Sequence, residues 1–157
     1  MRVEISTGFA CYLGAAPDAA DDEAPRLGQR SPDKVAQPRV LIVEDEGLVA
    51  MNMEIALAEE GFYILGIVDN EPEAVAAAER LKPDVILMDI TLREGDGISA
   101  ARTIAKRLDT RIVFVSGNSD PLTLAEAEAL RPAGFIRKPF VTDRLARLVR
   151  NALQHKN

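Results

Sequence analysis

Apolar and polar residues alternate in regular blocks from residue 39 onward. Short aliphatic runs recur, each followed by an acidic or glycine-containing turn and then by a segment with apolar residues three or four positions apart. Runs of the first kind are typical of strands that are buried on both faces, and the second spacing is typical of amphipathic helices. The expected strands are VLIV (residues 40–43), ILGIV (64–68), VILM (85–88), IVFV (112–115) and GFI (134–136).

Helix-boundary residues support this division. Gly61 is placed to end the first helix, Asn70 with Pro72 to begin the second, and Asp120 with Pro121 to begin the fourth. The expected buried faces are, in chain order, Leu48, Met51, Ile55 and Ala58; Val75, Ala78 and Leu81; Ile98, Ala101, Ile104 and Leu108; Leu122, Ala125 and Ala129; and Val141, Leu145, Leu148, Val149 and Ala152. Five such βα units predict an α/β fold, a doubly wound five-stranded parallel sheet with helices on both faces.

Length and composition fit one folded domain with an extension. The chain has 157 residues, of which 47% are hydrophobic, enough for one core but not for two compact domains. The stretch from residue 15 to 38 is rich in Pro, Asp, Ala and Gln and has few large apolar side chains. Such a segment cannot offset its ordering entropy by burial. We therefore expect a disordered arm over residues 1–38 and a folded domain over residues 39–157.

Charge and cysteine content exclude several classes of protein. The chain has 19 basic and 25 acidic residues, a net charge of −6, which argues against nucleic acid as the partner. Its apolar runs are too short to span a bilayer, so we expect no membrane partner. The single cysteine, Cys11, allows no intrachain disulfide and fits the reducing cytoplasm. The N-terminal segment matches a signal peptide only weakly. A frayed tail or a misassigned start codon is the simpler interpretation.

Chemically active side chains follow four of the five expected strands. They are Glu44, Asp45 and Glu46 after the first strand, Asp89 after the third, Ser116 after the fourth and Lys138 after the fifth. Ligands gather at the carboxyl ends of strands in such sheets. Acids that converge there repel one another unless a cation joins them, and oxygen ligands without histidine or cysteine suit Mg²⁺. We infer that Asp89 is a nucleophile that accepts a phosphoryl group, whose charge the metal and Lys138 neutralise.

Each of these residues also has a simpler interpretation. An acid at a strand end is often a helix cap or half of a structural ion pair. The acids after the first strand could interact only with the positive end of the next helix. Ser116 is a common type of turn residue, and Lys138 could be a surface lysine. The functional interpretation depends on all of them meeting at one edge.

Four motifs carry a resemblance to the receiver domain of bacterial two-component response regulators over about residues 39–153. They are LIVEDE (41–46), ILMDITLREGDG (86–97), FVSG (114–117) and FIRKPF (135–140). The resemblance implies a flavodoxin-like receiver fold and a Mg²⁺ cofactor. It implies Asp89 as phosphoacceptor, Lys138 as the phosphate-pairing lysine, Ser116 as the switch hydroxyl and Phe135 as the switch aromatic. It also implies Asp45, Asp89 and the Thr91 carbonyl as metal ligands, Glu44 acting through a metal-bound water, and a cis bond between Lys138 and Pro139.

The sequence departs from the family pattern at several positions. Glu44 replaces the common aspartate, Ser116 replaces the common threonine, and Arg93 stands where proline is frequent, which would loosen the loop after Asp89. Thr91 and Asn118 match the two variable positions that tune dephosphorylation.

The resemblance implies signalling rather than enzymology. The protein would take its phosphoryl group from a histidine kinase or a histidine phosphotransfer protein and lose it by autodephosphorylation, with no other enzyme activity. Only QHKN follows the expected fifth helix, so a stand-alone receiver is expected, which acts on a downstream protein target. The fourth helix, fifth strand and fifth helix would form the surface that changes, and are a candidate homodimer face. His155 is interpreted as a tail residue.

Two other functions stay open, and the residues argue against two more. A pseudo-receiver would use the same fold as an interaction module without phosphorylation, and a phosphate sink would accept the group without an output. An aspartate-based phosphatase would need an acid where Thr91 stands. Flavin or nucleotide binding would need a phosphate cradle after the first strand, where three acids would repel it.

Overall fold

The computed structural model describes residues 37–117 and 120–154. The expected arm lies almost wholly outside the described residues, as do Cys11, Asn118 and His155. The expectations about those residues therefore stay predictions. Within the described residues no helix is long and apolar enough to span a membrane.

One parallel sheet forms the centre of the domain. Its strands lie in the order β2-β1-β3-β4-β5, and every neighbouring pair is parallel. Their bounds are β1 Arg39–Val43, β2 Tyr63–Val68, β3 Val85–Asp89, β4 Arg111–Ser116 and β5 Gly134–Arg137. The structure confirms the predicted fold class and all five predicted strands, each with ends within one residue of those expected.

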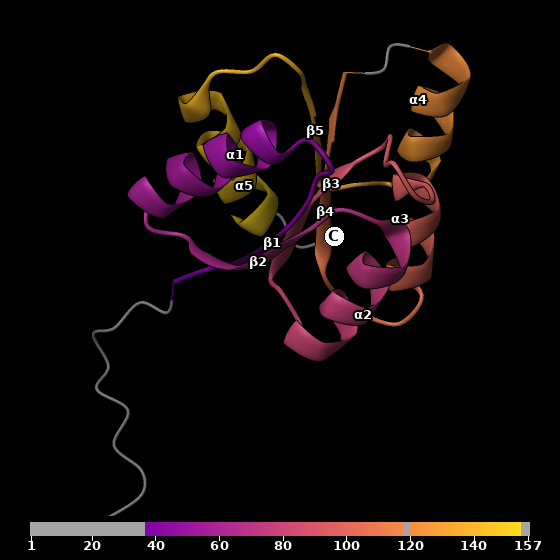
Figure 1. Cartoon of the computed structure of the whole chain (residues 1–157), viewed down its shortest axis with the longest axis horizontal. Coiled ribbons are helices and arrows are strands. Elements are labelled where there is room, and N and C mark those ends of the chain that lie inside the picture. Colours follow the sequence, from indigo (N-terminus) through magenta and orange to yellow (C-terminus); the bar gives the residue numbers. More distant parts are fainter. Residues whose placement is uncertain (1–36, 118–119, 155–157) are drawn as a thin grey trace, which may run out of the picture. The chain divides into compact units, whose positions relative to one another are not determined.

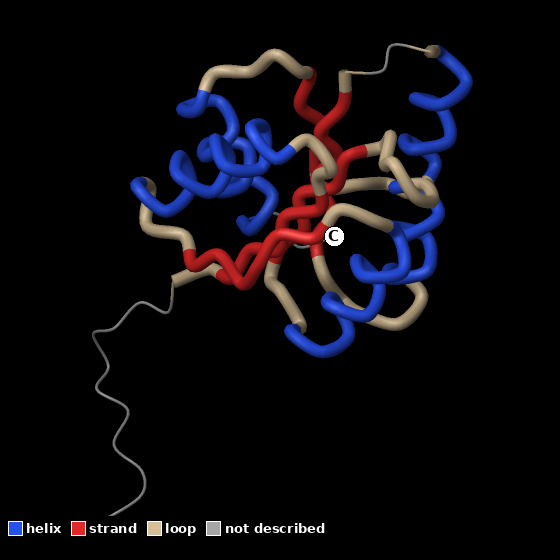
Figure 2. Tube along the Cα trace, viewed as in Figure 1, coloured by secondary structure: helices blue, strands red, loops and turns tan. Residues whose placement is uncertain are grey.

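Five helices cover the two faces of the sheet. They are α1 Gly47–Glu59, α2 Glu71–Leu81, α3 Gly97–Ala105, α4 Pro121–Ala129 and α5 Thr142–Gln154. Figure 1 shows α1 and α5 on one face and α2, α3 and α4 on the other. Figure 2 shows the strands as a continuous layer between these two sets of helices.

The helices begin where capping residues stand. The Asn70 side chain accepts a hydrogen bond from the Glu73 backbone N–H at 2.9 Å, and the Asp120 carboxylate accepts one from Thr123 N–H at 2.9 Å. Both N-caps had been predicted. They satisfy backbone donors that the first turn of a helix leaves without a partner.

Alternating side chains of each strand build two separate cores. Val40 and Ile42 of β1 face α1 and α5, whereas Leu41 and Val43 face α2 and α3. β3 is buried along its whole length, including Asp89. A parallel sheet covered on both faces explains why its central strands are apolar without a break.

The predicted buried face of α1 is wrong. Leu48, Met51 and Ile55 are 74%, 47% and 50% exposed, and Ala58 is also exposed. The buried residues of α1 are instead Ala50, Met53, Ala56 and Leu57. Both sets satisfy helical spacing, and the packed set combines two alanines with Met53 and Leu57.

The predicted face of α4 is also wrong. Leu122 is 76% exposed, and Ala125 and Ala129 are also exposed, whereas Ala127 is buried with Leu124 and Leu130 beside it. Val141 precedes α5 and is exposed, but the rest of the predicted α5 face packs as expected. The predicted faces of α2 and α3 are confirmed.

Candidate functional site

The carboxyl edge of the sheet brings the predicted site residues onto neighbouring strands. β1 leads into Glu44, β3 ends at Asp89, β4 ends at Ser116, and Lys138 follows β5. Glu44, Asp89 and Ser116 are the buried polar residues among those that the structure describes, at 1%, 4% and 3% exposure. Buried polar groups are costly unless they have partners, so this edge is built for interaction.

Lys138 is the centre of the site. Its Nζ lies 2.6 Å from Asp89 Oδ2 and 2.9 Å from Glu44 Oε1, and it donates a hydrogen bond to each. The second Glu44 oxygen, Oε2, lies 2.7 Å from the same ammonium as an ion pair without a hydrogen bond of its own. Glu46 Oε1 lies 3.4 Å from Nζ. One ammonium therefore faces three carboxylates.

The pKa values of two groups depart from their ordinary values. Burial of the Glu44 carboxylate raises its pKa, and the hydrogen bond from Lys138 offsets only part of that effect. For Lys138, partial burial lowers the pKa, but the hydrogen bonds to Asp89 and Glu44 outweigh it and the net shift is upward. Lys138 is therefore held in its charged form.

The donor set fits a hard divalent cation. Glu44, Glu46 and Asp89 each offer a carboxylate oxygen, and these oxygens lie within 4.8 Å of one another. Three carboxylates against one lysine leave two negative charges uncompensated if all the carboxylates are ionised. Mg²⁺ takes oxygen ligands of this kind and keeps several waters. A metal would thus balance the local charge.

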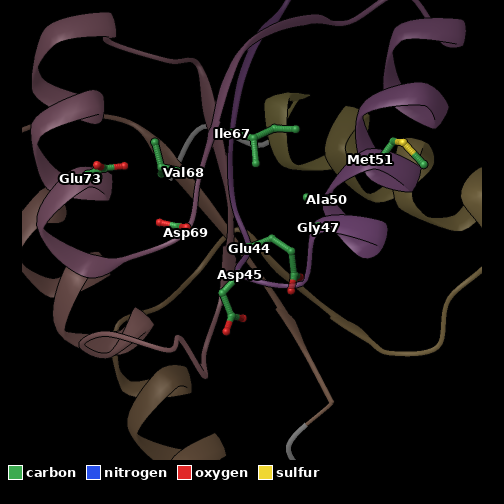
Figure 3. A pocket seen from close by; sticks show the side chains of 9 residues that line it. All are labelled: Glu44, Asp45, Gly47, Ala50, Met51, Ile67, Val68, Asp69 and Glu73. Carbon is green, nitrogen blue, oxygen red and sulfur yellow. The ribbon is translucent and has the colours of Figure 1, made fainter.

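Asp45 lies apart from this group of three carboxylates. Its Oδ2 lies 3.9 Å from Nε of Arg93. Figure 3 shows the side chains of Asp45 and Glu44 pointing in different directions from the end of β1. Asp45 lines a pocket of 410 Å³ together with Glu44, Asp69 and Glu73, whose other wall includes Met51 and Ile67 of α1 and β2. The role of Asp45 as a metal ligand stays a prediction.

Backbone contacts hold the remaining predicted residues near the site. The Thr91 backbone N–H donates to Asp89 Oδ1 at 3.0 Å, so each carboxylate oxygen of Asp89 accepts one hydrogen bond. The Lys138 N–H donates to the Ser116 carbonyl at 3.0 Å. The peptide bond between Lys138 and Pro139 is cis, as the resemblance implied.

Phe135 lies on β5, which β4 separates from the strand that carries Asp89. Its ring stacks on that of Phe114 with centroids 5.4 Å apart and an interplanar angle of 30°. Phe114 is fully buried and Phe135 is half-buried. The aromatic predicted to take part in switching therefore packs at the margin of the core.

Sequence reasoning missed two contacts at this edge. Glu46 was listed among the converging acids but was given no role at the site, yet it contacts Lys138. Arg93 was noted only as a departure that loosens its loop, yet it pairs with Asp45. Opposite charge between motifs that meet at the sheet edge was the available signal for both contacts, but it does not determine which acid pairs with which cation.

Comparison with known proteins decides the family. The profile of the response regulator receiver domain matches residues 40–150. The chain belongs to this family. The earlier resemblance is thereby confirmed, and bacterial two-component response regulators are its relatives.

Two relatives illustrate the extent of the match to receivers. The chain is 32% identical to the chemotaxis protein CheY of Bacillus subtilis over 117 residues, which cover 73% of this chain and 97% of CheY. It is 37% identical over 108 residues to the transcriptional regulatory protein PdtaR of Mycobacterium tuberculosis, covering 69% of this chain and 53% of PdtaR. The chain thus matches about half the length of PdtaR.

Solved receiver structures show the same fold. The receiver domain of a modulated diguanylate cyclase from Desulfovibrio desulfuricans G20 is 37% identical, with a TM-score of 0.72 and coverage of 75% of this chain and 94% of that one. The response regulator domain of Thermotoga maritima CheB is 29% identical, with a TM-score of 0.71 and coverage of 77% and 99%.

Proposed function

We propose that this receiver accepts a phosphoryl group on Asp89 in a Mg²⁺-dependent reaction and thereby switches a protein-binding surface. The observation that carries the proposal is the buried Asp89 at the end of β3, with Lys138 Nζ at 2.6 Å. A merely structural ion pair would not need further acids around one lysine. Glu44 and Glu46 beside the same ammonium leave a surplus of negative charge that a metal cation can balance.

The proposed transfer follows from the position of the carboxylate. An oxygen of Asp89 attacks the phosphorus of a phosphohistidine, the P–N bond breaks, and the histidine leaves with its electron pair. The donor is a histidine kinase or a histidine phosphotransfer protein. Lys138 holds the Asp89 carboxylate before transfer and can pair with a phosphoryl oxygen afterwards. Hydrolysis of the acyl phosphate by water ends the signal, and we propose no other enzyme activity.

The metal site is proposed from this chain's own oxygen ligands. Asp45, Asp89 and the Thr91 carbonyl would hold Mg²⁺, with Glu44 acting through a bound water. When bound, the metal supplies positive charge for the phosphoryl oxygens. Asp45 must then turn from Arg93 toward Asp89, because its carboxylate lies outside the group formed by Glu44, Glu46 and Asp89.

The proposed output is a change in the surface formed by α4, β5 and α5. A phosphoryl group on Asp89 would draw the Ser116 hydroxyl toward it, and Phe135 would move into the space that opens. Phe135 suits this role because it is half-buried and stacked on Phe114 at the margin of the core. A local charge event of this kind biases a two-state element. The surface would bind a downstream protein or a second copy, in the cytoplasm.

Phosphorylation by a small donor tests the proposal. The full chain is incubated with Mg²⁺ and acetyl phosphate and weighed by intact mass spectrometry, beside Asp89→Asn and the control Asp109→Asn, an exposed acid that follows α3. The parent and Asp109→Asn gain one phosphoryl mass, and Asp89→Asn does not. A parent that binds Mg²⁺ but gains no mass would favour the pseudo-receiver, and a labelled protein that binds no target would favour the phosphate sink.

A further inference from the structure

Arg93 makes two contacts with Asp45. Its Nε lies 3.9 Å from Asp45 Oδ2, and its Nη2 donates to the Asp45 carbonyl at 3.5 Å. The Arg93 side chain is 78% exposed, whereas that of Asp45 is only 19% exposed. A solvated cation therefore lies against a carboxylate that is mostly covered by protein.

The loop that carries Arg93 is anchored, although its side chain is not. The Glu71 N–H donates to the Glu94 carbonyl at 3.1 Å, and the Asp96 N–H donates to Glu71 Oε2 at 2.9 Å. Both hydrogen bonds tie the segment after Arg93 to the start of α2. The backbone thus holds Arg93 beside Asp45, while the long side chain can leave at little cost.

Lys138 and Arg93 pair with different members of the three acids that follow β1. Lys138 pairs with Glu44 and Glu46, whereas Arg93 pairs with Asp45, the residue between them. A guanidinium carries a permanent charge and cannot give up a proton to make room for a metal. A metal that draws Asp45 toward Asp89 therefore separates its carboxylate from Arg93.

We propose that Arg93 competes with Mg²⁺ for Asp45 and so weakens the affinity of the site for the metal. This inference rests on the proposed Mg²⁺ site. An exposed ion pair is worth little, so Arg93 tunes the affinity and does not block the site. The same competition returns Asp45 to Arg93 whenever the metal leaves.

Isothermal titration of the full chain with MgCl₂ tests the competition. We compare the parent with Arg93→Ala, Arg93→Lys and Arg80→Ala, the last of which removes an exposed arginine from the final turn of α2. Arg93→Ala lowers the Mg²⁺ dissociation constant by about two- to fivefold, the range that an exposed ion pair supports. Arg93→Lys stays near the parent value, and Arg80→Ala leaves the constant unchanged.

A second measurement separates direct pairing from a general charge effect. In nitrogen-15 NMR spectra of the parent, saturating Mg²⁺ moves the Arg93 Nε–H signal to the position typical of a solvated arginine. An unmoved signal, or an Arg93→Ala variant with unchanged or weaker Mg²⁺ binding, overturns the inference while the proposed function stands. A parent that binds no Mg²⁺ at all overturns both.

Discussion

Gly97 lies directly against the backbone of Asp89. A Cβ at Gly97 would fall 1.8 Å from the Asp89 carbonyl oxygen, far inside any real contact. The Gly97 N–H donates to the Ile90 carbonyl at 3.0 Å, so the start of α3 is bound to the segment that follows the proposed phosphoacceptor. The absence of a side chain at residue 97 allows α3 and Asp89 to be this close.

Gly97→Ala should therefore disturb both stability and the site. The methyl group must push α3 or the Asp89 backbone aside, and overpacking of this kind costs about 1–3 kcal/mol of unfolding free energy. Mg²⁺ affinity should fall as well, because Asp89 moves with its backbone. Urea unfolding and calorimetric titration with Mg²⁺ measure the two effects.

Gly47→Ala is the matched control for this substitution. Gly47 is the first residue of α1, and a Cβ there meets nothing within 4 Å. The change should leave stability equal or raise it by up to about 1 kcal/mol, since alanine favours the helix. Equal losses in both variants would contradict the packing argument at Gly97.

Lys138→Met should destabilise the domain when Mg²⁺ is absent. It leaves Glu44 and Asp89, both buried, without the ammonium that lies 2.7 Å and 2.6 Å from their oxygens. Breaking a fully buried pair costs about 3–5 kcal/mol, and the partial exposure of Lys138 reduces this to about 1–3 kcal/mol. Urea unfolding with and without Mg²⁺ measures the loss, which the metal should partly restore by supplying positive charge to the same carboxylates.

Lys106→Met is the control for the loss of one lysine. Lys106 is exposed at the end of α3, and its substitution should change the unfolding free energy by less than about 0.5 kcal/mol. If Lys138→Met were as mild as Lys106→Met in the absence of metal, the carboxylates would not depend on Lys138.

The raised pKa of Lys138 predicts a loss of stability at alkaline pH. Because the pKa in the folded protein lies above the ordinary value of 10.5, the folded chain holds this proton more tightly than the unfolded chain. The contribution is complete below the unfolded pKa and disappears as pH rises through the folded one. As pH rises above about 10, the parent should therefore lose more unfolding free energy than Lys138→Met. If the unfolding free energies of the parent and of Lys138→Met fell in parallel with pH, this prediction would be refuted.

The sequence was sufficient to predict which residues meet at the sheet edge but not how they pair. Parallel strands must end at one edge, so Glu44, Asp89 and Lys138 had to converge once the strands were located. The pairing depends on side-chain rotamers that spacing does not determine. Asp45 turns to Arg93 while its neighbours turn to Lys138, and no pattern in the sequence distinguishes these two directions.

The helix faces show a second limit of sequence reasoning. In α2 and α3 the larger apolar residues are on the buried side, and the predicted faces were confirmed. In α1 two stripes of apolar residues compete, and the buried stripe is the one with Met53 and Leu57. Hydrophobic spacing shows that a stripe exists, but the distance between helix and sheet decides which stripe fits.

A pair of substitutions on α1 tests which stripe is packed. Ile55 is 50% exposed, whereas Leu57 is fully buried against the sheet. Ile55→Gln should change the unfolding free energy by less than about 0.5 kcal/mol. Leu57→Ala should cost about 2–5 kcal/mol, because it opens a cavity that the rigid sheet cannot fill. Urea unfolding distinguishes the two variants. A large loss of unfolding free energy in Ile55→Gln with little loss in Leu57→Ala would mean that α1 packs by the face that carries Ile55.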